Sequence, residues 1–233
     1  MATASPSAVG FQGGLHANDN ITSKDYGRLL GRHGRRLSQQ VAGVLDKYST
    51  SSKLSAMPFT QERYARALEF AARAHGEQKT PTGLPYIVHV VSVAMEVMAA
   101  LQAEPGHDED LAITCALLHD VVEDTPTTLA QVEAAFGEPT AAGVAALTKD
   151  SARERTNAMR DSLERIMREP AEIAMVKLAD RATNMAPPPR HWTDAKITAY
   201  RAEAELILTT LGTASPTLAA RLRERISRYP AGR

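Results

Sequence analysis

The sequence is poor in several features, and each shortage excludes a class of protein. Its 27 lysine and arginine residues are balanced by 27 aspartate and glutamate residues, so we expect neither nucleic acid nor an anionic membrane as a partner. The single cysteine, Cys115, excludes an internal disulfide and fits a reducing cytoplasm. No apolar run reaches the ~18 residues of a membrane-spanning helix, and the first residues lack the basic and apolar regions of a secretory signal.

The 233 residues divide into two parts of different composition. Hydrophobic residues make up 43% of the sequence and aromatic residues only 5%, which suffices for one domain of ordinary size. Residues 1–24 are rich in Ala, Ser, Gly and Asn without a repeating pattern, whereas residues 25–48 alternate apolar and basic positions, interrupted by glycines. We therefore predict a flexible N-terminal tail with a weak basic helix over residues 1–57, and one folded domain over residues 58–233.

After Pro58 the pattern is that of amphipathic helices with little strand signal, which predicts an all-α domain. Thr60 is the predicted N-cap of the first helix, and the proline-rich segment APPPRHW is predicted to end the seventh. Cys115, within AITCALLHD, is expected to pack as a small apolar side chain. The predicted helices cover residues 60–76, 86–103, 108–123, 127–136, 139–148, 152–168, 170–186, 193–212 and 216–227.

The segment LLHDVVEDT follows an apolar run with a cluster of polar groups. On a continuous helix His119 stands over Glu123 and Asp120 stands over Asp124, because residues four apart share a face. A histidine combined with carboxylates suits Mn²⁺, Fe²⁺ or Zn²⁺ better than Ca²⁺ or Mg²⁺. The alternative is a helix C-terminus that exposes its acids to water, with His119 satisfied by a backbone carbonyl.

Two further segments place polar residues among apolar ones. Asp180, in MVKLADRATNM, needs a partner, which is either Lys177 or Arg181 in an ordinary ion pair or the same metal ion. His89 interrupts the apolar segment PYIVHVVSVAMEV, and His75 lies in FAARAHGEQ. Each histidine is either a hydrogen-bonded core residue or a source of an imidazole ligand, the other supporting it.

The segments AARAHGEQ…GLPYIVH, ALLHDVVEDT and KLADRATNM, in this order, resemble the HD-type hydrolase domain of the RelA/SpoT homologues. The resemblance covers roughly residues 60–212, so the protein looks like a stand-alone small alarmone hydrolase with an all-helical HD bundle over residues 58–233. It implies that Glu123 and Asp124 lie beside the attacking water as the catalytic acids. It also implies a Mn²⁺ ion and four metal ligands, which are His89, His119, Asp120 and Asp180.

The reaction implied by the resemblance is hydrolysis of the 3′-diphosphate of (p)ppGpp to pyrophosphate and GDP or GTP. Composition and spacing alone reach only a metal-dependent phosphohydrolase. A second hypothesis is a module that senses alarmone or metal without turnover, although the two acids argue against it. The partner expected is a nucleotide substrate, and the oligomeric state is not predicted.

The resemblance extends less fully to the substrate. Relatives carry an Arg-Lys pair before the glycine of the HGEQKTPTGLPYIVH segment, with the arginine stacked on guanine, but this sequence has Thr80 and Pro81 there. Lysine lacks the planar guanidinium that stacks on a base, so (p)ppApp and NADPH are rival substrates. The substrate contacts that the resemblance assigns are Lys79, Thr82, Asn184, Lys196 and Tyr200. The alternative for Lys196 is an exposed lysine, and for Tyr200 a half-buried ring.

Overall fold

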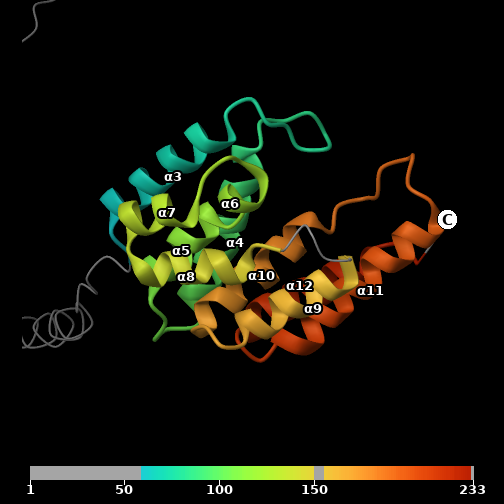
Figure 1. The fold of residues 1–233 in the computed structure, drawn as a ribbon. Coiled ribbons are helices and arrows are strands. Elements are labelled where there is room, and N and C mark those ends of the chain that lie inside the picture. The colour runs from blue at the N-terminus through green and yellow to red at the C-terminus, as the bar shows by residue number, and fades with distance from the viewer. Residues whose placement is uncertain (1–58, 150–154, 232–233) are drawn as a thin grey trace, which may run out of the picture. The chain divides into compact units, whose positions relative to one another are not determined.

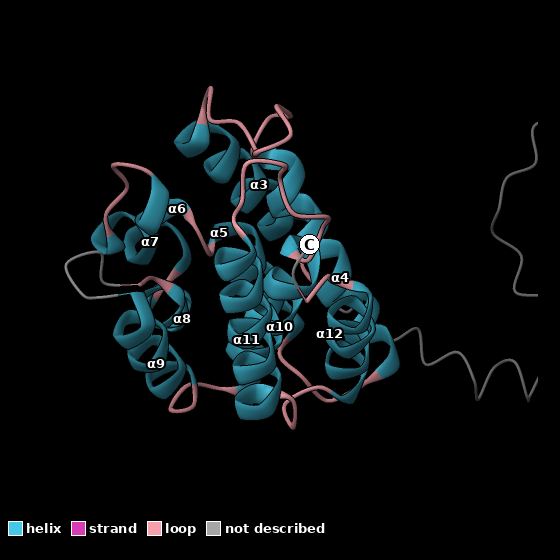
Figure 2. Ribbon diagram, turned by 90° about the vertical axis from the view of Figure 1, so that its right-hand side faces the viewer, coloured by secondary structure: helices cyan, strands magenta, loops and turns pink. Residues whose placement is uncertain are grey.

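The computed structural model describes residues 59–149 and 155–231, and its regular structure is helical (Figures 1 and 2). Within these ranges the only β-type pairing is an isolated bridge between Lys79 and Pro85. The all-α prediction is confirmed, whereas the tail and basic helix predicted over residues 1–57 lie outside the described residues. The helices are α3 (Gln61–His75), α4 (Ile87–Ala103), α5 (Glu109–Leu118), α6 (Val121–Asp124), α7 (Leu129–Phe136), α8 (Glu138–Leu147), α9 (Arg155–Ile166), α10 (Ala171–Asn184), α11 (Asp194–Leu211) and α12 (Pro216–Arg228).

Helices α5 and α10 form the centre of the bundle. Helix α10 packs against α4, α5, α11 and α12. Every residue from Leu111 to Leu118 in α5, and every residue from Glu172 to Ala182 in α10, is buried. A helix that is buried on all sides has no face left for water. The charged residues of α10 must therefore find partners inside the protein. None of the described helices combines the length and apolarity that crossing a membrane requires.

The ends of the outer helices are fixed by local side-chain bonds. Thr128 and Gln131 form a capping box at the start of α7. The cap predicted at Thr60 is different, because its side chain makes no cap bond to α3. Instead the Thr60 hydroxyl donates to Asp110 Oδ2 at 2.7 Å. This bond ties the start of α3 to the first turn of α5.

The continuous helix predicted over residues 108–123 is wrong in one respect. The structure divides it at His119 and Asp120 into α5 and the short α6. Asp120 has φ −105° and ψ −4°, the sparsely populated bridge region where many active-site residues sit. The His119 side chain bonds back to its own helix and the Asp120 carboxylate bonds outward, and such local bonds compete with regular helix geometry. The two parallel rows of polar groups predicted from an unbroken helix are therefore not formed as such.

Gly143 allows α8 to approach the central helices closely. A Cβ atom at this position would lie 2.5 Å from Ile173 Cδ1 and 2.9 Å from Cys115 Sγ, so a larger residue would force the helices apart. Cys115 is fully buried at this contact, as expected for a small apolar side chain. Burial raises the pKa of its thiol to about 12.

Candidate active site

Three helices bring their polar residues to one buried point. His89 comes from the first turn of α4, His119 from the end of α5, and Asp180 from the centre of α10. One potential ligand atom from each of the three lies within 4.8 Å of the others, and all three residues are buried. The sequence places these residues 30 and more positions apart, and the fold brings them together as predicted.

The two imidazoles are arranged as metal ligands require. His119 Nδ1 donates to the carbonyl oxygen of Ala116 at 2.8 Å, which directs Nε2 into the cluster. Nε2 of His89 and Nε2 of His119 are both buried, and among the described residues neither makes a well-formed hydrogen bond, although carboxylate oxygens of Asp120 and Asp180 lie 2.9–3.8 Å away. Buried polar atoms without partners are rare and costly, and a cation bound between them would satisfy both. The donor set therefore fits a divalent metal ion.

Asp120 lies beside the same two imidazoles. Its Oδ2 atom is 2.9 Å from His119 Nε2 and 3.7 Å from His89 Nε2, and it accepts a hydrogen bond from the Tyr86 hydroxyl at 2.6 Å. Burial raises the pKa of Tyr86 far above its usual range, and Asp120 raises it further, so the hydroxyl remains a donor. Burial acts to raise the pKa of Asp120, but His119 outweighs burial and holds this pKa below its usual range.

The charge of His119 is set by its carboxylate neighbours. Burial acts to lower the pKa of His119, but Asp120 outweighs burial, and with Asp180 it raises this pKa to about 9. The cluster thus attracts one positive charge to the point between the carboxylates. A metal ion bound here would replace that proton, because histidine ligates through its neutral imidazole.

Asp180 is held by contacts within α10 and from α4. Lys177 Nζ lies 3.3 Å from Asp180 Oδ2, Asn184 Nδ2 donates to Oδ1 at 2.6 Å, and His89 Nε2 lies 3.5 Å from Oδ1. Burial acts to raise the pKa of Asp180, but Lys177 and the histidines hold it well below its usual value. Of the two ion-pair partners considered from the sequence, Lys177 is the one observed, whereas Arg181 pairs with Glu203 instead.

Glu123 and Asp124, on α6, have different partners. Lys149 binds both oxygens of Glu123, through Nζ to Oε1 and through its backbone N–H to Oε2 at 3.0 Å. Asp124 Oδ2 accepts from Gln78 Nε2 at 3.0 Å, and Gln78 Oε1 in turn lies 2.9 Å from His75 Nδ1. His75 thus contacts Gln78 and lies outside the cluster of three ligand atoms, with its Nε2 buried and without a hydrogen bond among the described residues.

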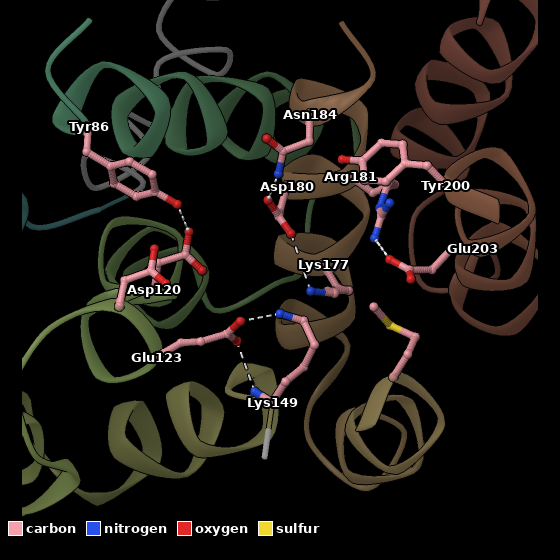
Figure 3. A pocket seen from close by; sticks show the side chains of 12 residues that line it. Tyr86, Asp120, Glu123, Lys149, Lys177, Asp180, Arg181, Asn184, Tyr200 and Glu203 are labelled. Carbon is pink, nitrogen blue, oxygen red and sulfur yellow. Dashed lines mark hydrogen bonds and ion pairs between the residues drawn. The ribbon is translucent and has the colours of Figure 1, made fainter. Parts of the chain in front are cut away.

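A cavity of about 350 Å³ opens beside the cluster (Figure 3). Acidic residues from α6 and α10 stand on one side of it, and Tyr200 with Glu203 from α11 on the other. Its volume lies at the lower end of the range for small-molecule sites. The lining residues are Tyr86, Asp120, Glu123, Asp124, Lys149, Met159, Lys177, Asp180, Arg181, Asn184, Tyr200 and Glu203.

Comparison with a known family agrees with this geometry. The model of the HD domain family matches residues 67–218, well over half of the chain. The chain belongs to the HD domain family. HD domains bind divalent metal ions, and within the described residues His89, His119 and Asp180 form the cluster that could hold one.

Several named proteins are similar in sequence to this chain. A guanosine-3′,5′-bis(diphosphate) 3′-pyrophosphohydrolase of Aquifex aeolicus is 38% identical over 135 residues, which cover 57% of this chain and 18% of that protein. A human protein of the same name is 35% identical over 140 residues, covering 58% of this chain and 76% of that protein. The chain thus spans less than a fifth of the Aquifex relative and about three quarters of the human one.

A solved structure resembles the fold as well. It belongs to a metazoan orthologue of SpoT described as hydrolysing ppGpp. The TM-score is 0.63 at 27% sequence identity, and the match covers 74% of this chain and 98% of the other. The helical HD bundle inferred from the sequence is therefore confirmed.

The five predicted substrate contacts of the HD domain divide into two groups. Asn184 and Tyr200 line the cavity, although the Asn184 amide is already bonded to Asp180. Lys79, Thr82 and Lys196 are exposed and do not line it. The structure thus brings only two of the five to the cavity wall.

An aromatic stack stands behind the far wall of the cavity. The Arg181 guanidinium lies over the Tyr200 ring, 4.4 Å from its centroid, and Trp192 packs edge-on against Tyr200 at 5.2 Å. Burial raises the pKa of Tyr200 to about 12, although Arg181 opposes this shift, so the phenol stays neutral. Lys196 does not reach the cavity because its Nζ lies over the Trp192 ring, 4.3 Å from the centroid.

The α3–α4 loop folds onto itself. Thr80 N donates to the Leu84 carbonyl at 2.8 Å, and Gly83 N donates to the Thr80 carbonyl at 2.9 Å. Gly83 has φ +86°, a conformation that favours glycine. These bonds close a tight exposed turn in which Thr80 and Pro81 offer no planar cation to a base.

Sequence reasoning missed four residues with clear places at the site. Tyr86 had a signal, because it stands within the PYIVH segment that contains His89. Lys149 follows the end of α8, where a lysine ordinarily faces water, and nothing in the sequence indicates its contact with Glu123. Gln78 follows the end of α3, and Glu203 lies within α11. Only the fold reveals their partners, which are Asp124 and Arg181.

Proposed function

We propose that this protein is a Mn²⁺-dependent hydrolase that removes the 3′-diphosphate of (p)ppGpp, giving pyrophosphate and GDP or GTP. One observation carries the proposal: two buried imidazole nitrogens, those of His89 and His119, converge with the Asp180 carboxylate beside a cavity lined by the further acids Glu123 and Asp124. The names of the Aquifex and human relatives, which describe them as guanosine-3′,5′-bis(diphosphate) 3′-pyrophosphohydrolases, support this choice of substrate. We assign the activity to the HD domain, residues 58–233.

The ligands in this proposal are His89, His119, Asp120 and Asp180. Two imidazoles and two carboxylates form a mixed nitrogen and oxygen set that suits several first-row metals, and the resemblance to RelA/SpoT homologues favours Mn²⁺ among them. When bound, the ion supplies a Lewis acid that activates water and offsets phosphate charge. The Tyr86 hydroxyl and the Asn184 amide orient the two ligand carboxylates, a role typical of groups just outside a metal's ligands.

The two acids of α6 are the proposed proton acceptors. A water molecule attacks the phosphorus bonded to the ribose 3′ oxygen, the bond between these two atoms breaks, and the proton of the water passes to Asp124 or Glu123. The resulting carboxylic acid then gives this proton to the departing 3′ oxygen, which becomes the 3′ hydroxyl. Gln78 fixes Asp124 and Lys149 fixes Glu123, so both carboxylates are held at the cavity wall before substrate enters. The products are pyrophosphate and the nucleotide with a free 3′ hydroxyl.

A second candidate substrate class has an observation in its favour. The turn that contains Thr80 and Pro81 closes on its own backbone and carries no arginine to stack on guanine. (p)ppApp and NADPH, which also carry phosphate on a ribose hydroxyl, are therefore the alternative substrates for the same chemistry. A metal or alarmone sensor without turnover is the remaining alternative.

The decisive experiment follows pyrophosphate release from ppGpp and ppApp, and phosphate release from NADPH, with the full chain stripped of metal and then reloaded with Mn²⁺. Mn²⁺-dependent release from ppGpp is the expected result. Release from ppApp or NADPH alone would replace the substrate and retain the chemistry. No release from any of the three, with the nucleotides still binding, would establish the sensor in place of the enzyme.

A further inference from the structure

Acidic side chains outnumber basic ones in the lining of the cavity. Five lining side chains are acidic and three are basic, namely Asp120, Glu123, Asp124, Asp180 and Glu203 against Lys149, Lys177 and Arg181. A divalent ion cancels this excess of two negative charges. A substrate that carries a diphosphate group then still needs positive charge from the protein, because phosphate binding without counter-charge is unfavourable in a partly closed cavity.

Arg181 is poorly placed to provide that charge. Its Nη2 pairs with Glu203 and its guanidinium lies over the Tyr200 ring, so its charge is already engaged, although its buried Nε and Nη1 make no hydrogen bond within the described residues. Lys149 and Lys177 are the remaining cationic side chains among those that line the cavity. Figure 3 shows the Lys149 side chain bonded to Glu123 of α6 and the Lys177 side chain bonded to Asp180.

Lys177 is unusually buried for a lysine. Its side chain is only 6% exposed, near the middle of α10, in which every residue from Glu172 to Ala182 is buried. The ammonium group has three donors, and its one hydrogen bond within the described residues goes to Asp180 at 3.3 Å. Burying an ammonium group is costly unless several of its donors are satisfied. A second anion at the cavity would satisfy the donors that Asp180 leaves.

Lys149 differs from Lys177 because its partner is exchangeable. Its side chain is 29% exposed and its Nζ pairs with Glu123, a carboxylate that is itself 25% exposed. A partly exposed ion pair of this kind contributes only about 0–1 kcal/mol. An ammonium bonded to a diphosphate oxygen loses little by leaving Glu123. The backbone N–H of Lys149 continues to hold the carboxylate after the ammonium has left.

We propose that Lys149 and Lys177 form the subsite for the diphosphate that is cleaved, and that Lys149 Nζ exchanges Glu123 for a phosphate oxygen when substrate binds. This inference rests on the proposed function, since it names the residues that bind the leaving diphosphate. Before substrate arrives, Lys149 neutralises Glu123. Once the ammonium has moved to phosphate, Glu123 is free to accept a proton, so the acid becomes available only in a loaded site.

The test uses inorganic pyrophosphate, titrated calorimetrically into the Mn²⁺-loaded full chain. Lys149→Met removes the ammonium, Lys149→Arg keeps the charge, and Arg168→Met removes an exposed positive charge at the end of α9, away from the cavity. We expect Lys149→Met to weaken pyrophosphate binding by about tenfold, the effect of losing one charge-assisted hydrogen bond. Lys149→Arg should restore most of the affinity, and Arg168→Met should leave it unchanged.

Steady-state kinetics with the hydrolysed nucleotide give a second readout. We expect Lys149→Met to raise KM by a similar factor, with a smaller loss of kcat, whereas damage to the fold would lower kcat and the unfolding temperature together. Unchanged pyrophosphate affinity in Lys149→Met, or no binding by the unaltered chain, would overturn the subsite. Lys149-dependent pyrophosphate binding in a chain that hydrolyses no alarmone would support the subsite and refute the proposed function separately.

Discussion

The cluster of His89, His119 and Asp180 and the α3–α4 loop, which leads directly to His89, are specified in opposite ways. His89 and Asp180 are buried, and Asp180 bonds to Lys177 and Asn184 of its own helix and faces His89 of α4 at 3.5 Å. The loop around Thr80 is exposed and bonds mainly to its own backbone. A buried polar group must be satisfied inside the protein, whereas water satisfies an exposed one. Burial therefore restricts which residues can form the cluster, whereas the loop is restricted only by the geometry of its turn.

The largest expected effect lies in the cluster. Asp180→Asn removes a proposed ligand charge with little change of shape, and we expect metal affinity and turnover to fall by more than about 100-fold, which is the upper limit for loss of a merely orienting group. Metal content measured by atomic absorption, together with pyrophosphate release, checks this. Asp161→Asn, on α9 and outside the cavity, is the matched control. Full Mn²⁺ content in Asp180→Asn would exclude Asp180 from the ligand set.

The two acids of α6 should separate chemistry from metal binding. We expect Glu123→Gln combined with Asp124→Asn to lower kcat by about 10²–10⁴-fold, the usual contribution of a positioned proton acceptor, while Mn²⁺ stays bound. Glu133→Gln, on the exposed side of α7, serves as the control. Unchanged turnover in the double variant would remove both acids from the mechanism.

Metal binding at the cluster should also depend on pH. The pKa of His119 is raised to about 9 in the metal-free protein, so a proton competes with the metal below that pH. Apparent Mn²⁺ affinity should therefore rise with pH, by up to about tenfold per unit, between about pH 7 and about pH 8. Calorimetric titrations in buffers of different ionisation enthalpy would reveal the released proton. An affinity independent of pH would show that His119 is already neutral.

The same contrast explains what the sequence could predict. Asp180 and His89 stood out because each interrupts an apolar helix, whereas their place in one ligand set was implied by the resemblance to the RelA/SpoT homologues. The break at Asp120 could not be foreseen, because it depends on the Tyr86 hydroxyl, a partner 34 residues away. The position of Lys196 was also out of reach, since its contact with Trp192 diverts it from the cavity.

The smallest expected effect lies in the loop. Thr80→Arg combined with Pro81→Lys gives the turn the planar cation that relatives carry, and we expect KM for ppGpp to fall by about fivefold, as for an exposed cation over an aromatic face. Thr80→Lys combined with Pro81→Lys supplies the same charge without the planar group. An equal effect of both pairs would mean that charge, and not stacking, is what the turn lacks.

The chain contains a single tryptophan, and its position makes it a natural optical probe. Trp192 packs against Tyr200, a residue that lines the cavity. The Lys196 ammonium lies over the Trp192 indole itself. A nucleotide that displaces Tyr200 or draws Lys196 away would change the quenching of the indole. Intrinsic fluorescence of the unlabelled protein can therefore report when the cavity fills, in real time and separately from catalysis.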